Sequence, residues 1–195
     1  MVAPREIRLE SASDDRRTLR IALSANIAMF VVGLIGWRIA HSTALLADAF
    51  DMLADASGYA IAYWAVGRSK RDKQLAARWS GAMLMALGFS IIGEVIHRWL
   101  SPEEPAGVLI MAFATLSLVV NGSVLRMLSK YRHAADPHLR ATWVDTRADV
   151  LVNVGVLLSG AAIAWTGYRV IDLLTGAAIS VFVIHEGIEI WRDDD

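Results

Sequence analysis

Three aspartates interrupt an otherwise apolar stretch of the sequence, HSTALLADAFDMLADASGYAIAYW, which runs from His41 to Trp64. Asp48, Asp51 and Asp55 are spaced i, i+3 and i+7, so at about 100° per residue they lie on one face of a helix. A carboxylate in hydrocarbon is costly, so three on one face need cationic partners or a watery cavity. The spacing therefore indicates a functional site inside a membrane.

A second apolar stretch repeats this anomaly. In ATWVDTRADVLVNVG, Asp145 and Asp149 are spaced i and i+4, again on one face of a helix. Asp51 lies about eight residues, or ~12 Å, from one end of its apolar segment, and Asp149 lies at a similar depth from the opposite end of its own. If the two helices are antiparallel neighbours, the carboxylates of Asp51, Asp55, Asp145 and Asp149 converge on one cavity. Asp48 shares the face of the first helix but has no counterpart in the second, so it is a candidate for a position beside the cavity or at its entrance, with a structural role as the alternative.

Four carboxylates held together in a low dielectric cannot all remain ionised, so we expect some of them to carry protons when no cation is bound. A divalent cation reverses this balance, because it binds the ionised oxygens and expels the protons. The sequence holds no cysteine, and ligation by oxygen alone favours harder ions such as Mn²⁺ or Fe²⁺, although Zn²⁺ and Co²⁺ also accept carboxylates. The residues therefore predict the exchange of a metal ion for protons.

A structural role for these acids is the alternative, in which they are buried ion-pair partners that hold helices together. Arg147 is the nearest basic residue in the sequence, but it points roughly 160° to 200° away from the face of Asp145 and Asp149. We therefore expect Arg147 to pair with an acid of a neighbouring helix.

The composition is that of a membrane protein. The 195 residues are 55% hydrophobic, against about 45–50% in an ordinary soluble domain, and six apolar segments of roughly 20 residues are each long enough for the ~30 Å bilayer core. We expect an all-α bundle of six transmembrane helices in residues 19–192, after a cytosolic tail in residues 1–18 and with no C-terminal cytosolic domain. The expected helices run from Leu19 to Ala40, Thr43 to Gly67, Trp79 to Leu100, Gly107 to Leu128, Ala141 to Thr166 and Tyr168 to Ile190.

Basic residues predict the orientation of this bundle, because Lys and Arg in short loops favour the cytoplasmic side. Both connections 68–78 and 129–140 are basic, whereas only Arg38, Arg98 and Arg169 lie near the opposite ends of the helices. We expect a multi-pass protein of the bacterial inner (plasma) membrane, with both termini in the cytosol, surrounded by the lipid bilayer and without a nucleic-acid partner.

Four more polar residues are candidates for positions near the ion or along its pathway: Asn26, Asn153, Glu94 and His97. An interhelical hydrogen bond is the alternative role of the two asparagines. Helix packing is the favoured role of Glu94 and His97.

The run SxALLADAxxMLAD, present from Ser42 to Asp55, resembles the second-helix signature of the cation diffusion facilitator (cation efflux) family of divalent-metal/proton antiporters. Further similarity covers nearly the whole chain, in the third helix (Ala77 to Pro105), at Asn121 in the fourth, and in the fifth (Arg140 to Gly155). The resemblance implies a six-helix transporter with alternating access, usually a homodimer. It also implies that the transported ion is bound by Asp51, Asp55, Asp145 and Asp149.

The chain departs from the family pattern in its ligands. Zinc-preferring members place a histidine at the first ligand position of one or both helices, whereas this chain has aspartate at all four positions. That pattern resembles the manganese-type or iron-type members. The family's usual C-terminal cytosolic domain helps dimerisation, so the resemblance implies the transport site more directly than the homodimer.

We therefore expect a secondary transporter, not an enzyme, that exports a divalent transition-metal cation (Mn, Fe, Zn or Co) from the cytosol by proton antiport, without a prosthetic group. A non-transporting membrane subunit that binds metal is one alternative. An intramembrane aspartyl protease is another, since it also needs two aspartates on different helices, but the sequence has no Gly-x-Gly-Asp type motif.

Overall fold

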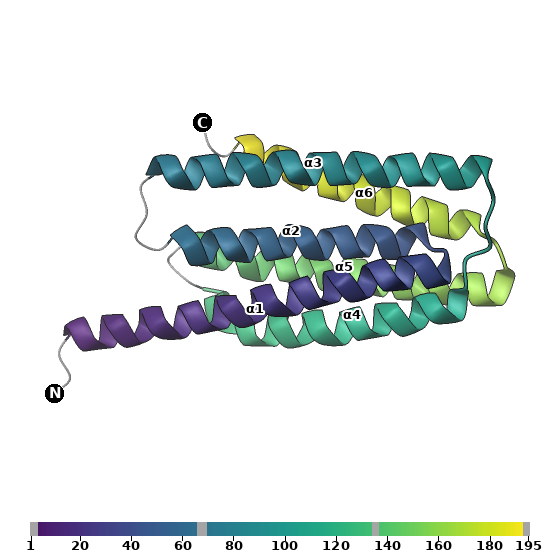
Figure 1. The fold of residues 1–195 in the computed structure, drawn as a ribbon. Helices are drawn as coiled ribbons and strands as arrows, with labels where there is room; N and C mark the ends of the chain where they lie inside the picture. The colour runs from purple at the N-terminus through teal and green to yellow at the C-terminus, as the bar shows by residue number, and fades with distance from the viewer. Residues whose placement is uncertain (1–3, 66–69, 134–136, 193–195) are drawn as a thin grey trace.

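The computed structural model describes residues 4–65, 70–133 and 137–192, in which every regular element is helical. The helices run up and down along one axis, and α1 begins at the end of the bundle where α6 ends (Figure 1). This arrangement agrees with the expected all-α bundle. The elements are α1 (Pro4–Ala40), α2 (Thr43–Ala65), α3 (Lys70–Leu100), α4 (Gly107–Leu128), the 3-10 helix η1 (Ser129–Tyr131), α5 (Pro137–Thr166) and α6 (Val170–Arg192).

The helix bounds differ from the predicted ones mainly at the charged ends. The bounds of α4 are those predicted, but α1 begins at Pro4 instead of Leu19, and α3 begins at Lys70 instead of Trp79. Apolar length marks only the part of a helix inside the bilayer, whereas Arg, Lys, Glu and Gln are good helix formers in water. Both helices therefore continue beyond their apolar parts.

Five of these helices are long and apolar enough to cross a membrane, within the described residues. The exception is α2, which is 23 residues long and could span a bilayer core of ~30 Å, but which carries the three aspartates. The five spans are Asp14–Ala40, Gly81–Leu100, Gly107–Tyr131, Thr146–Thr166 and Val170–Glu189.

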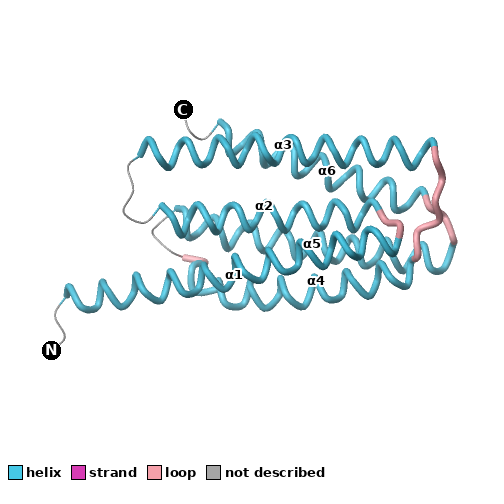
Figure 2. The backbone as a smooth tube through the Cα atoms, viewed as in Figure 1, coloured by secondary structure: helices cyan, strands magenta, loops and turns pink. Residues whose placement is uncertain are grey.

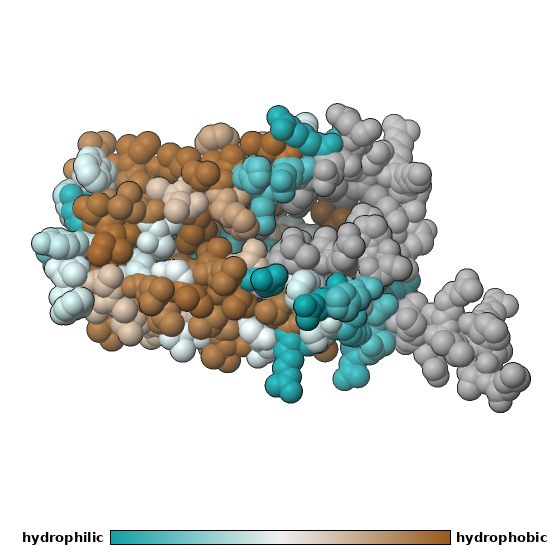
Figure 3. Space-filling model, turned by 180° about the vertical axis from the view of Figure 1, so that it is seen from behind, coloured by the Kyte–Doolittle hydropathy of each residue, from teal (hydrophilic) through white to brown (hydrophobic). Residues whose placement is uncertain are grey.

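A hydrophobic belt covers the face of the molecule shown in Figure 3, next to a paler, more hydrophilic rim at one end. In water, each exposed apolar Å² would cost about 25 cal/mol, so a belt of this kind fits contact with lipid. Its position agrees with the predicted spans. Exposed large apolar side chains include Ile27, Val31, Ile35, Phe89, Ile96, Val119, Leu158 and Val181.

The most extensive helix pairs are α1 with α2, α3 with α6, and α4 with α5. Helix α2 also packs against α3, α5 and α6, so it lies among the others rather than at the edge. The connections 41–42, 101–106 and 167–169 gather at one end of the bundle (Figure 2), which we call the loop end.

Close contact between α1 and α2 depends on a glycine. A Cβ added at Gly33 would lie 2.8 Å from the Cβ of Ala49, which is too close for two carbon atoms. The contact fixes the relative height of the two helices, and thus the depth of the α2 aspartates.

We expect the Gly33→Ala variant to unfold at a lower temperature in detergent, because overpacking a tight contact costs about 1–3 kcal/mol. Gly122 of α4 provides the matched control, since a Cβ added there meets nothing within 4 Å. The Gly122→Ala variant should be as stable as the wild type or slightly more stable, because alanine favours helix. Equal unfolding temperatures for the two variants would contradict this account of the α1/α2 contact.

Candidate metal centre

The carboxylates of α2 are buried within the bundle. Asp48 is 1% exposed and Asp51 is 2% exposed, while Asp55, one turn further along, is partly buried. Because other helices pack around α2, its polar face meets protein instead of lipid. The structure therefore places the predicted α2 ligands in the interior.

A hydrogen bond between the hydroxyls of Tyr59 and Thr146 joins α2 to α5. The two helices are antiparallel, so Asp55, one turn before Tyr59, lies level with Asp149, one turn after Thr146. The carboxyl groups of Asp55 and Asp149 lie close enough to act on each other, and the charge of Asp51 also acts on Asp149. Asp149 of α5 thus lies beside Asp55 and within reach of the charge of Asp51, both predicted ligands from α2.

The fourth predicted ligand is Asp145, four residues before Asp149 on α5, and its side chain lies outside the described part of the structure. Among the side chains that are described, no three of His, Asp and Glu are close enough together to hold one metal ion. Coordination by four aspartates therefore stays a prediction.

Glu186 of α6 is a further carboxylate near this group. It is partly buried, and its negative charge acts on both Asp51 and Asp149. The sequence argument missed Glu186 because it lies near the end of its apolar segment, where an acid is ordinary, and only the packing of α6 against α2 and α5 brings it close. The one signal that could have found it is an acidic residue within FVIHEGIEIW.

Neutral polar side chains from three other positions share this interior. Asn26 and Asn153 are 0% exposed and Asn121 is 1% exposed, and the Oδ1 atom of each lacks a hydrogen-bond partner. The Nδ2 groups of Asn26 and Asn153 donate to the backbone oxygens of Ala22 (3.1 Å) and Asp149 (2.7 Å). Buried oxygens without a donor are costly, so they suit a cation or a water molecule that would bind them.

The depth of Asn26 follows from the α1/α2 contact. These helices are antiparallel and Gly33 meets Ala49. Asn26, about two turns from Gly33, therefore lies level with Asp55, which is nearly two turns from Ala49. Asn26 is thus at the depth of the acids, as its candidacy for the pathway requires.

Asp48 makes a different contact from the other two acids of α2. Its Oδ2 accepts a hydrogen bond of 3.0 Å from the hydroxyl of Ser117 on α4, and its Oδ1 has no partner. Asp48 thus bonds to α4, whereas Asp55 contacts α5. This difference favours a role for Asp48 beside the ion site, not within it.

Glu94 and His97 lie near the loop end, in a separate cluster. Glu94 accepts hydrogen bonds from Trp37 Nε1 (3.4 Å) and Arg98 Nε (2.6 Å), and His97 is exposed. These contacts agree with the favoured packing role of Glu94.

Arg147 is exposed, while Asp149 two residues later is buried, as the helical spacing predicts.

Comparisons with known proteins agree with this architecture. The cation efflux transmembrane domain matches residues 19–194. Zinc transporter ZitB of Yersinia pestis is 29% identical over 93% of this chain and 61% of its own length. Metal cation efflux system protein CzcD of Cupriavidus metallidurans is 28% identical over 87% of this chain and 57% of its own. A cadmium, cobalt and zinc/H(+)-K(+) antiporter of Bacillus subtilis is 26% identical over 92% of this chain and 62% of its own.

The chain belongs to the cation efflux family, because the family's transmembrane domain matches nearly all of it. This confirms the resemblance drawn from Ser42 to Asp55. The family and these relatives are transporters and not enzymes, so the aspartyl protease alternative is set aside. The chain spans about three fifths of the length of the curated relatives that it matches.

Proposed function

We propose that this protein exports a divalent transition-metal cation across a membrane in exchange for protons. The ion binds Asp51 and Asp55 of α2 and Asp145 and Asp149 of α5, and the site faces the two sides of the membrane alternately.

The observation that carries the proposal is the contact between Asp55 and Asp149 from two different helices, deep in the bundle and next to Asp51. The charges that act on Asp51 and Asp149 are those of other carboxyl groups. Acids that hold helices together structurally need a cation among them. Around Asp51 and Asp149, a transported ion or protons would supply positive charge that these neighbouring carboxyl groups do not.

Proton exchange follows from the same contact. Two carboxyl groups held this close together away from water share a proton, because their negative charges repel and a protonated group can donate to an ionised one. A metal ion needs both groups ionised, so its binding releases protons. Exchange at one site couples the two fluxes, since metal and protons cannot occupy it together.

The relatives and the ligand chemistry of the site favour different ions. The named substrates of the relatives are zinc, cadmium and cobalt, whereas four aspartates provide oxygen ligands alone, which favour Mn²⁺ or Fe²⁺. We propose an ion of the Mn, Fe, Zn or Co class.

The orientation of the bundle rests on the basic segments. With α2 as a sixth span, both termini and the basic connections 68–78 and 129–140 face the cytosol, and the loop end faces the outside. The names of bacterial relatives support a bacterial inner membrane. The homodimer that the resemblance implies stays a prediction.

Metal flux tests the proposal. Purified protein in proteoliposomes with a metal-sensitive dye inside should take up at least one of Mn²⁺, Fe²⁺, Zn²⁺ and Co²⁺ faster than protein-free liposomes. Equilibrium binding of the same ions is measured on the same sample. Binding without flux would contradict transport and favour the non-transporting subunit.

A further inference from the structure

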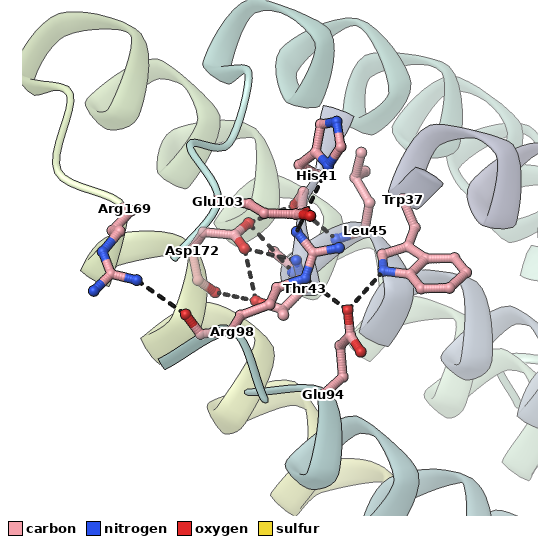
Figure 4. Close-up of polar contacts among 11 residues, drawn as sticks. Trp37, His41, Thr43, Leu45, Glu94, Arg98, Glu103, Arg169 and Asp172 are labelled. Atoms are coloured by element: carbon pink, nitrogen blue, oxygen red, sulfur yellow. Dashed lines mark hydrogen bonds and ion pairs between the residues drawn. The ribbon is translucent and has the colours of Figure 1, made fainter. Parts of the chain in front are cut away.

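A buried carboxylate of α6 holds the first turn of α2. Asp172 is 1% exposed, and its Oδ2 accepts hydrogen bonds from the backbone N–H of Thr43 (2.6 Å) and from the Thr43 hydroxyl (2.6 Å). Its Oδ1 accepts from the Ser42 hydroxyl and from the N–H of Ala44 (3.3 Å). We call Asp172 together with Ser42, Thr43 and Ala44 the Asp172 clamp, part of which is visible in Figure 4.

The clamp satisfies groups that helix geometry leaves unpaired. The first N–H groups of a helix have no partner within it, and the N-terminus carries a partial positive charge that stabilises an anion. Asp172 supplies that anion from another helix, while Ser42 Oγ accepts from the N–H of Leu45 (3.1 Å) in the ordinary capping manner. The charge of Asp172 is therefore stabilised by α2, and the stabilisation is lost if α6 moves away.

A glycine lets α6 approach α2 at this point. A Cβ added at Gly176, one turn after Asp172, would lie 2.9 Å from Thr43 Oγ1 and 3.0 Å from the carbonyl carbon of Thr43. The two helices are thus in backbone contact beside the clamp, with no space for even a methyl group.

The first two turns of α2 are enclosed on all sides. Each of the eight residues 42–49 is at most 5% exposed, although an ordinary helix of a membrane bundle has one face toward lipid or a cavity. In this structure no face of α2 offers water a path from the loop end to Asp51, two residues further on.

Charged side chains tie the neighbouring segments to the clamp. Arg169 Nη1 donates to the backbone oxygen of Arg98 (2.9 Å), and Arg98 Nη1 lies 3.4 Å from Glu103 Oε2. His41 Nδ1 lies 2.6 Å from the same Glu103 oxygen, and this hydrogen bond holds the pKa of Glu103 below its usual range. Contacts of these four residues link the 167–169 connection before α6, the end of α3, the 101–106 connection and the α1–α2 turn around Thr43 (Figure 4).

We propose that the Asp172 clamp is the gate of the ion pathway at the loop end, and that it is closed in this structure. The inference rests on the proposed function, since a gate needs a pathway. Opening requires the first turn of α6 to leave α2, which breaks the hydrogen bonds to Asp172 together. Water then solvates both Asp172 and the freed N–H groups, so the open state loses contacts without leaving a buried charge. Asp172 is thus satisfied both when it is bonded to α2 and when it is solvated by water. The clamp can therefore both close and open, as a gate must.

Thiol labelling tests the gate, because the chain has no cysteine of its own. Ala47 is 0% exposed and lies one turn before Asp51, so Ala47→Cys reports access below the clamp. A membrane-impermeant thiol reagent added on the loop-end side should label this variant slowly. In the double variant that combines Ala47→Cys with Asp172→Asn, the labelling rate should be at least about tenfold higher than in Ala47→Cys alone. The reason is that Asp172→Asn removes the charge from several charge-assisted hydrogen bonds.

A second variant opens the clamp by sterics instead of charge. Gly176→Ala places a methyl group against Thr43 and should also raise the labelling rate, whereas Gly122→Ala, whose Cβ meets nothing within 4 Å, should not. Far-ultraviolet circular dichroism and the unfolding temperature show whether each variant is folded.

Unchanged labelling in the folded Asp172→Asn or Gly176→Ala variant would overturn the gate. Faster labelling of the Gly122→Ala control would overturn it too, since general loosening would then explain the result. The rates are measured without metal and without flux. A protein that transports nothing would therefore overturn the proposed function and leave the labelling result intact.

Discussion

Replacing Asp149 by alanine is expected to lower metal flux at least ~100-fold. Loss of a residue that only supports a metal ligand costs about 10–100-fold in affinity or activity, and Asp149 is proposed to be a ligand itself. Asp51→Ala should have the same effect, because it removes a carboxylate from the other helix of the site. The measurement is initial metal uptake into proteoliposomes at matched protein content.

Stability separates this functional role from a structural one. Asp149 is buried among acids, so the Asp149→Asn variant, which keeps the size and removes the charge, should unfold at the wild-type temperature or above it. If Asp149 instead held helices together in a buried ion pair, loss of that charge would cost about 3–5 kcal/mol.

Asp14 provides the control for both measurements. It is exposed and pairs with Lys130 at 2.6 Å, far along α1 from the site. Asp14→Ala should transport metal like the wild type. Wild-type flux in Asp51→Ala or Asp149→Ala, or loss of flux in Asp14→Ala, would contradict the assignment of the ligands.

A histidine at position 145 is expected to shift the ion preference toward zinc. Imidazole nitrogen is a better ligand for Zn²⁺ than for Mn²⁺ relative to carboxylate oxygen, and one added nitrogen should raise the zinc-to-manganese flux ratio by roughly tenfold. The test is a flux panel with Zn²⁺, Mn²⁺, Fe²⁺ and Co²⁺ on wild type and Asp145→His.

The exposed Asp14→His variant controls for the addition of a histidine as such. It should leave the order of preference unchanged. If Asp145→His also leaves that order unchanged while it still transports metal, selectivity is determined elsewhere in the protein.

The helices of the bundle could be predicted from the sequence because apolar length is a local property. The bounds of α4 were predicted to the residue, since prolines and polar residues precede Gly107 and a basic segment follows Leu128. The starts of α1 and α3 could not be predicted in this way. Their charged first turns lie outside the apolar segments, and hydropathy does not detect a helical segment that is exposed to water.

The meeting of Asp51, Asp55 and Asp149 was also predictable in part. Spacing within a helix shows which acids share a face, and two such helices at matched depth imply a common site. Glu186 shows the limit of this argument, because its position near Asp51 depends on how α6 packs against α2. Asp172 shows the same limit, since an acid in the first turn of a helix gives no sign that it caps a different helix.

Simultaneous measurement of metal and proton movement tests the central claim most directly. Proteoliposomes that contain a metal-sensitive dye and a pH-sensitive dye are exposed to an outside metal pulse, with wild type and Asp149→Ala side by side. The account predicts that the wild type takes up metal while protons leave the lumen, and that both signals vanish in the variant. Metal uptake with no proton movement, or unchanged signals in Asp149→Ala, would contradict exchange of metal for protons at this site.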